Sequence, residues 1–263
     1  MPIRPPSLSR FRSARRVDQR FLAENKALIE RIDRRKVLRG SLSLGALALL
    51  GGCDVTDTDA MQKVLTAVSA WNDRAQALLF NQSQLAPTFT EAEVLKPPRF
   101  NAYYGIDDVN PVDVSTWKLE LGGLIADKRP RTPAQIYALP EQELIIRHVC
   151  VEGWDYIGQW SGVNLRSFLE MVGADLTAKY VAFRCYDDYY GSIDMATALH
   201  PQTILATRYA KEYIGDPFGY PLRLRTSIKL GFKNPKWITS IEVTNNYPGG
   251  YWEDRDYNWF SGL

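Results

Sequence analysis

Short apolar runs rich in β-branched and aromatic residues recur from Ser115 to Asn245. They span 115–125 (STWKLELGGLI), 143–151 (ELIIRHVCV), 178–186 (AKYVAFRCY), 221–227 (PLRLRTS) and 237–245 (WITSIEVTN). In the first run Trp117, Leu119 and Leu121 alternate with polar residues, which is the pattern of a half-buried strand. The helical patterns between the runs are brief, at 132–139, 165–173 and 194–200. We therefore predict an α+β domain with a largely β core and short peripheral helices.

Charge is distributed unevenly along the chain. Residues 1–40 hold twelve of the 32 Lys and Arg residues but four of the 30 Asp and Glu residues. The formal net charge of +2 thus averages a basic leader and a mildly acidic body. An acidic body argues against a nucleic-acid partner, which usually requires a basic face.

The basic leader has the pattern of an export signal. The pair Arg34-Arg35 precedes a moderately apolar run at 40–52, which is too short to cross a hydrocarbon core of about 30 Å at about 1.5 Å per residue. Paired arginines before a weak apolar core resemble a twin-arginine signal, although Asp33 replaces the usual Ser or Thr. We predict that 1–53 directs export to the periplasm.

The end of this leader, LGGC at 50–53, resembles a lipobox. If Cys53 is lipidated, Asp54 occupies the position of an inner-membrane retention signal. A retained N-terminal anchor is the alternative. Residues 54–98 are predicted as an amphipathic helix within 55–86, followed by a proline-containing extended lead-in to a domain at 99–263.

Three interpretations of the two remaining thiols stay open on the sequence alone. Cys150 and Cys185 both end apolar runs, so they could pair as a disulfide in an oxidising compartment or be buried as inert thiols. Cys150 could also form a dyad with His148, which shares its strand face. His148 and His200 lie too far apart in sequence to suggest a multi-histidine site, and no nucleotide-binding glycine loop is present.

A second unusual stretch, at 218–236, alternates basic and apolar residues. Its cations are Arg223, Arg225, Lys229, Lys233 and Lys236. Such a concentration in an acidic domain suits a phosphate or pyrophosphate group. A solvated strand edge, on which lysines discourage edge pairing, is the alternative.

Three segments in order resemble one known family. RHVCVEGWDYIGQWSG (147–162), HPQTILA (200–206) and GYPLRLRTSIKLGFKNPKWITSIEV (219–243) are similar to sulfite-oxidase-type molybdopterin oxidoreductases, and most of all to periplasmic methionine sulfoxide reductase catalytic subunits and their uncharacterised relatives. The resemblance covers about Arg99 to Asn245. It implies a Mo-molybdopterin cofactor and the α+β fold of that family.

The resemblance also implies roles for individual residues. Cys150 corresponds to the thiolate that ligates molybdenum, a soft anionic ligand, and Trp154 and Trp160 are expected to wall the cavity. Asp155, which follows the Cys150 loop, is the predicted catalytic partner. The implied cofactor contacts are Asn101, Tyr103, Tyr104, Cys185, Arg223, Asn234, Pro235 and Lys236.

Two positions within the segments that carry the resemblance depart from the family pattern. Relatives often carry Thr at the position of Cys185, and Asn or His at that of Phe218. The aromatic tail at 251–260 and the acids and tyrosines at 187–190 are further candidates for lining the pocket.

The expected activity is oxygen-atom or two-electron transfer at a single molybdenum centre. Because the chain has no haem CxxCH motif or iron–sulfur cysteine set, the resemblance implies a separate electron partner, either a membrane haem subunit or a cytochrome. Two alternatives remain: a methionine sulfoxide reductase that acts on periplasmic proteins, and a cofactor-free binding lipoprotein that keeps the fold.

Overall fold

The computed structural model describes residues 67–69, 71–73, 75–76, 79, 81 and 84–263, which all belong to the compact unit Leu65–Leu263. The predicted signal and Cys53 lie outside the described residues. The described positions from 67 to 79 are helical. Within the described part of the chain, no helix has the length and apolar character that a membrane span needs.

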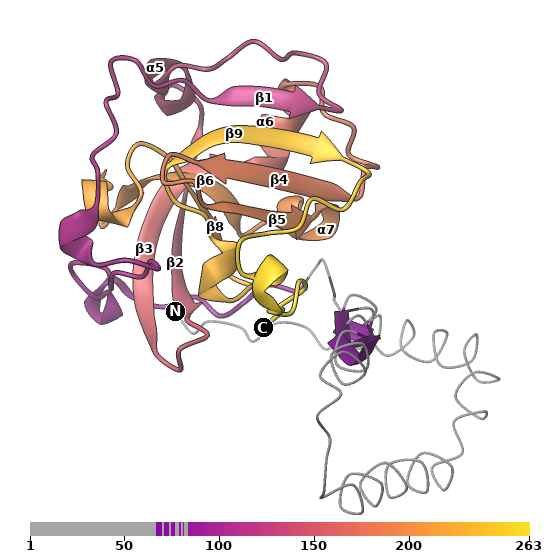
Figure 1. Cartoon of the computed structure of the whole chain (residues 1–263). Coiled ribbons are helices and arrows are strands. Elements are labelled where there is room, and N and C mark those ends of the chain that lie inside the picture. The colour runs from indigo at the N-terminus through magenta and orange to yellow at the C-terminus, as the bar shows by residue number, and fades with distance from the viewer. Residues whose placement is uncertain (1–66, 70, 74, 77–78, 80, 82–83) are drawn as a thin grey trace, which may run out of the picture. The chain divides into compact units, whose positions relative to one another are not determined.

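Two sheets form the domain (Figure 1). The first has the order β1 (Glu120–Gly123), β9 (Ile238–Thr244), β4 (Tyr180–Cys185), β5 (Tyr190–Asp194), with β1 parallel to β9. The second has the order β2 (Glu141–Val149), β3 (Asp155–Asn164), β6 (Thr203–Tyr209), β7 (Glu212–Tyr213), and β8 (Arg223–Thr226) also pairs with β6.

The helices are short and peripheral. They are α5 (Pro133–Tyr137), α6 (Leu165–Met171) and α7 (Met195–Ala198), with 3-10 turns η1 (Glu91–Glu93), η2 (Ile106–Asp108), η3 (Asp216–Phe218), η4 (Gly231–Lys233) and η5 (Glu253–Arg255). A capping box between Thr132 and Gln135 begins α5. The predicted α+β fold with a largely β core is confirmed.

Two apolar clusters hold the sheets together. In the larger one, Phe183 and Ile241 of the first sheet pack with Phe168 of α6 and Leu224 of β8. The smaller one gathers side chains from β2, β3 and β6, including the fully buried Trp160. Because β8 contributes to the core and pairs with β6, its residues are fixed in the interior, and every residue of this strand is buried.

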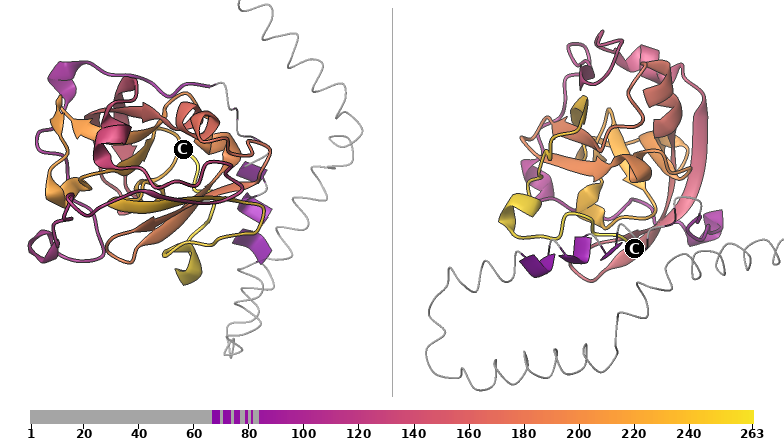
Figure 2. Two further views of the ribbon diagram at one scale, coloured as in Figure 1. Left: turned by 90° about the horizontal axis from the view of Figure 1, so that it is seen from above. Right: turned by 90° about the vertical axis from the view of Figure 1, so that its right-hand side faces the viewer.

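The C-terminal segment, residues 247–263, runs along the outside of the sheets (Figure 2). Near its end the Phe260 amide donates a hydrogen bond of 2.6 Å to Asp73 Oδ1 of the N-terminal helix. The Leu263 amide donates to the Ile228 carbonyl at 3.1 Å. This segment is therefore attached to the domain at its far end as well as through β9.

Candidate functional site

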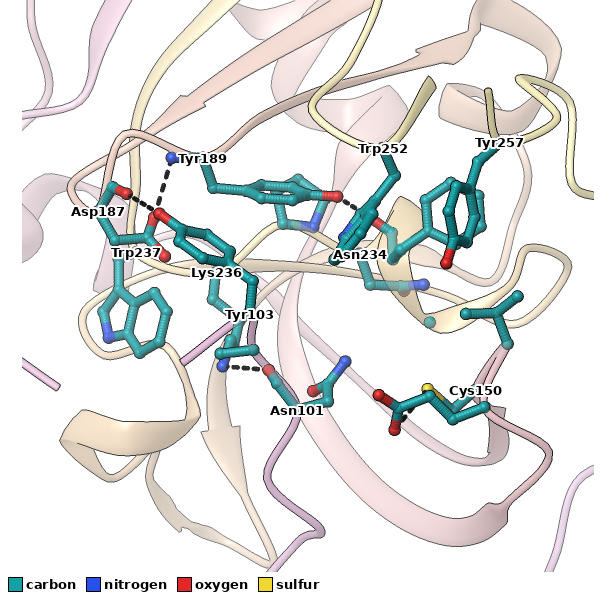
Figure 3. A pocket seen from close by; sticks show the side chains of 16 residues that line it. Asn101, Tyr103, Cys150, Asp187, Tyr189, Asn234, Lys236, Trp237, Trp252 and Tyr257 are labelled. Carbon is teal, nitrogen blue, oxygen red and sulfur yellow. Dashed lines mark hydrogen bonds between the residues drawn. The ribbon is translucent and has the colours of Figure 1, made fainter. Parts of the chain in front are cut away.

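A cleft with about 680 Å³ of space, part of it open to solvent, is lined by five separate stretches of the chain (Figure 3). These are Asn101–Tyr103, Cys150–Glu152, Asp187 with Tyr189, Gly231–Trp237, and Trp252 with Tyr257 of the C-terminal segment. Strands β2 and β4 end, and β9 begins, within two residues of the lining, so the cleft lies where turns of both sheets meet.

Cys150 follows the last residue of β2 and begins a tight turn. The Cys150 amide donates to the Trp154 carbonyl at 2.9 Å, and Gly153, at φ 87°, closes the turn. The residue is 7% exposed, and burial raises the pKa of its thiol. Its Sγ lies 3.8 Å from Oε2 of Glu152, which also accepts a 2.8 Å hydrogen bond from Trp154 Nε1. The turn thus presents one thiol and one carboxyl group to the cleft.

Three buried cations lie beside the cleft: Arg223, Arg225 and Lys236. Burial lowers the pKa of each arginine to about 10, and burial followed by the charge of Arg223 lowers the pKa of Lys236. Among the described residues, no carboxylate forms an ion pair with any of the three. Arg223 and Lys236 meet at Gly219 (φ 113°), where a Cβ would lie 3.1 Å from the Cβ of each.

Several hydrogen-bond donors near these cations have no acceptor within the described structure. They are Arg223 Nε and Nη2, Arg225 Nε, Trp160 Nε1 and His148 Nε2. The two guanidinium groups lie over the Trp160 ring, at 4.7 and 5.4 Å from its centroid. Unpartnered buried donors are costly, so this cluster is complementary to an acceptor group.

His148 is neutral in this environment. It is buried, and burial followed by the charge of Arg225 lowers its pKa well below the ordinary value. Arg225 Nη1 donates to its Nδ1 at 3.1 Å, so the proton of the neutral ring is on Nε2. A His148–Cys150 dyad, left open by the sequence, gains no support, because His148 Nδ1 accepts a hydrogen bond from Arg225 and the ring belongs to the buried cluster of cations and donors.

The turn at 234–236, whose residues the resemblance implies as cofactor contacts, borders the cleft. The side chain of its Asn234 is already hydrogen-bonded within the protein. Asn234 Oδ1 accepts from Arg225 Nη1 at 2.7 Å and from the Thr226 amide at 2.8 Å, and Nδ2 donates to the Leu230 carbonyl. Lys236 Nζ donates to the Asn101 carbonyl at 2.6 Å, which ties the lead-in to this turn. Asn101, Tyr103, Asn234, Pro235 and Lys236 therefore all line the cleft.

Asp187 lies beside the end of this turn, where the amide of the preceding Tyr186 donates to the Trp237 carbonyl at 2.9 Å. Its Oδ2 accepts from the Tyr104 hydroxyl at 2.9 Å, its carbonyl accepts from Tyr103, and burial raises the pKa of its carboxyl group. Tyr104 itself lies behind the cleft, with its ring stacked on Trp237. Asp187 is thus a partly buried carboxyl group of the cleft wall.

Several other sequence-predicted positions lie outside the lining of the cleft. Cys185 is a buried free thiol at the end of β4, Arg223 is buried behind the cleft, and Trp160 lies within the core. Trp154 stacks on His148 instead. Cys150 and Cys185 are both free thiols, so the structure contains no disulfide between them.

Asp155, the predicted catalytic partner, also lies away from the cleft. It pairs in register with Val149, and side chains opposite each other in an antiparallel pair share a face. That face is opposite to the one that carries His148, because side chains alternate along a strand. Asp155 forms an ion pair with Arg147 at 3.4 Å, and about half of its side chain is exposed.

The five cations at 223–236 divide into two groups. Arg223, Arg225 and Lys236 form the buried cluster described above, whereas Lys229 and Lys233 point to the C-terminal segment. Lys229 Nζ donates to the Phe260 carbonyl at 2.7 Å, and Lys233 forms an ion pair with Glu253. The alternative of a solvated strand edge is wrong, because all five side chains are buried.

One contributor to the cleft, Glu152, is clear only in the structure. Glu152 is separated from Cys150 by one residue, and its place in the turn was the available signal. Trp252 and Tyr257 confirm the expectation that the aromatic tail lines the pocket.

Comparison with known proteins identifies related chains. Residues 107–252 match the family described as oxidoreductase molybdopterin binding domain. The putative protein-methionine-sulfoxide reductase subunit YedZ1 of Azospira oryzae is 51% identical over 234 residues, with 89% of each chain covered. The protein-methionine-sulfoxide reductase catalytic subunit MsrP of Campylobacter jejuni is 28% identical, with 87% of this chain and 81% of that protein covered.

Among solved structures, the sulfane dehydrogenase SoxCD of Paracoccus pantotrophus aligns with a TM-score of 0.48 and 16% identity. The alignment covers 52% of this chain and 40% of that one.

Proposed function

The chain belongs to the oxidoreductase molybdopterin-binding domain family, and from this membership we propose that it is a reductase of methionine sulfoxide in exported proteins. Membership makes the chain an oxidoreductase with Mo-molybdopterin as its cofactor. The proposed reaction converts a sulfoxide, two electrons and two protons into a thioether and water. The names of the two relatives support this choice of substrate.

The residues present fit such a cofactor. Molybdopterin carries a phosphate, and the buried cluster of Arg223, Arg225 and Lys236 has positive charge without a carboxylate partner in the described structure. The unpartnered donors of Trp160 and His148 add to its need for an acceptor. This cluster of buried cations without a carboxylate partner in the described structure, of which Lys236 lines the same cleft as the Cys150 thiol, is the observation that carries the proposal.

Cys150 is the proposed protein ligand of molybdenum. A thiolate suits a soft metal, and the turn closed by Gly153 fixes its direction toward the cleft. Asn101, Tyr103, Pro235 and Lys236 are the proposed cofactor contacts in the lining. Arg223 lies behind the lining and would contribute its positive charge from there. Tyr104, Cys185 and Asn234 would contribute by holding the lining residues in place.

When bound, the cofactor supplies oxygen-atom transfer coupled to two-electron chemistry. The chain supplies the enclosure and the proton-holding groups. Asp187 retains a proton on its carboxyl group to higher pH than an exposed Asp does, because burial raises its pKa. Trp252 and Tyr257 cover one side of the cleft and limit the entry of water. Asp155 has no contact with the cleft, so we assign it no step.

Electrons would come from a separate partner, a membrane haem subunit or a cytochrome. The word subunit in the names of both relatives supports a multi-protein system. We propose export to the periplasm through the twin-arginine-like segment in 1–53, with Cys53 as the site of an inner-membrane lipid anchor.

Turnover tests the proposal. Full-length protein expressed with molybdenum and purified should oxidise reduced viologen when a peptide that contains methionine sulfoxide is added, and the peptide should lose one oxygen atom by mass spectrometry. Trimethylamine N-oxide and sulfite serve as comparison substrates. If molybdenum-loaded protein leaves the peptide unchanged, the proposed substrate is wrong. Protein that takes up no molybdenum would favour the cofactor-free alternative.

A further inference from the structure

Lys233 and Glu253 form an ion pair in which both side chains are almost completely buried, at 1% and 2% exposed. The lysine ends η4, in the turn that also lines the cleft, and the glutamate begins η5 in the C-terminal segment. Lys233 Nζ also lies 5.0 Å from the centroid of the Trp259 ring. The charge pair is therefore the internal link between the cleft and this segment.

The C-terminal segment is shaped around the Glu253 carboxylate. A Cβ at Gly250 would lie 2.1 Å from Glu253 Oε2, so any other residue at this position would displace the Glu253 carboxylate. Asp254, the next residue, accepts a 2.6 Å hydrogen bond from the Tyr190 hydroxyl. The Gly249 carbonyl accepts one from Ser192 at 2.6 Å. Together these contacts hold the chain on both sides of Trp252 against β5.

Held in this way, the segment presents two aromatic rings to the cleft. The Trp252 and Tyr257 rings lie 5.1 Å apart, and Tyr257 contacts Phe232 of η4 at 5.6 Å. Both line the cleft together with Cys150 and Glu152 (Figure 3). Glu253 itself is absent from this lining. On the side of the C-terminal segment, the ion pair can therefore influence a bound molecule through the two rings.

We infer that the Lys233–Glu253 ion pair is a latch that positions Trp252 and Tyr257 as the substrate-selecting wall of the cleft. Glu253 and Lys233 are positioning residues, and the rings are the groups that touch the substrate. The inference rests on the proposed function for its substrate, a sulfoxide on a peptide, and it names the residues that select that substrate. Both rings line the cleft together with the Cys150 turn, so a shift of the wall changes the fit of a bulky peptide more than that of a small sulfoxide.

A double-mutant cycle tests the latch. Glu253→Leu leaves a buried ammonium group unpaired and Lys233→Met leaves a buried carboxylate unpaired, whereas the double variant leaves neither. Removing one partner of a buried pair is far more disruptive than replacing both by apolar residues. The exposed Lys211–Glu91 pair, at 2.6 Å with side chains 58% and 57% exposed, provides matched controls in Lys211→Met and Glu91→Leu.

Hydrogen exchange of the full-length protein gives the first readout and needs no turnover. Each single variant should raise amide exchange across 247–263, and the double variant should return it toward the wild-type rate. The surface pair should leave exchange unchanged. Equal protection of 247–263 in the wild type and both single variants would overturn the latch. So would a double variant that exchanges as fast as the worse single variant.

Kinetics give the second readout. For the sulfoxide peptide, KM should rise roughly tenfold in each single variant, the scale of one lost pocket contact, and should recover in the double variant. For dimethyl sulfoxide KM should change less, and kcat should stay within about twofold because the Cys150 side of the cleft is untouched. A loss of kcat with KM unchanged would contradict the inference. If the wild type lacks turnover, the proposed function fails, while the exchange result still decides whether the latch exists.

Discussion

At the scale of single residues, burial lowers the pKa of every lysine and arginine in the stretch 218–236. Lys229 is 2% exposed, and burial lowers its pKa to about 8 despite the carboxylate of Asp194 at 3.1 Å. The positive charge of Lys233 lowers the pKa of Lys229 further, and the negative charge of Asp73 raises it. Lys229 Nζ donates a hydrogen bond of 2.7 Å to the Phe260 carbonyl. Lys229 therefore carries a folding cost that depends on pH.

We expect the free energy of unfolding to rise as the pH increases from about 8 to about 10.5. Below this window Lys229 is charged in both the folded and the unfolded state. The destabilisation caused by burying its charge is then present in full and does not change with pH. Within the window the unfolded chain keeps the proton that the folded chain releases, and stability rises with pH. The rise attributable to Lys229 is at most about 3 kcal/mol.

Urea unfolding of the wild type and of Lys229→Met at pH 7 and pH 9.5 measures this contribution. The wild type should gain more stability at the higher pH than the variant does. Identical pH dependence in the two proteins would show that Lys229 keeps an ordinary pKa.

At the scale of elements, the local patterns were predictable and the long-range contacts were not. The strand that ends just before Cys150 follows from its apolar run, and the short helix after Thr132 follows from its capping residues. Both patterns lie within a few residues of the sequence. The displacement of Asp155 follows from a two-strand register that no single run reveals. The pairing of Lys233 with Glu253 joins separate elements, and the sequence alone offered only a cluster of cations.

The turn between β8 and β9 depends on Asn234 more than on its lysines. Asn234→Ala removes the acceptor of Arg225 and of the Thr226 amide, both buried. We expect cofactor-free protein with this substitution to lose about 2–4 kcal/mol of unfolding free energy, because two buried donors become unsatisfied. Denaturant unfolding measures the change. A loss below about 0.5 kcal/mol would show that water replaces the side chain at no cost.

At the scale of the whole molecule, the cleft is built from five stretches that lie far apart in sequence. Family resemblance pointed to Asn101, Tyr103, Cys150 and the turn at 234–236, which all line the cleft. It placed Asp155 there as well, since nearness to Cys150 in sequence was mistaken for nearness in space. The aromatic wall was expected in outline, but the buried pair that holds it depends on the fold as a whole.

Molybdenum content measured by mass spectrometry, together with X-ray absorption at the molybdenum edge, tests the central claim most directly. Wild-type protein from molybdenum-supplied cells should hold one metal ion per chain. Cys150→Ser should keep its fold by circular dichroism and should lose the metal or bind it with one sulfur ligand fewer. Full molybdenum occupancy with an unchanged sulfur shell in Cys150→Ser would contradict the assignment of Cys150 as the metal ligand.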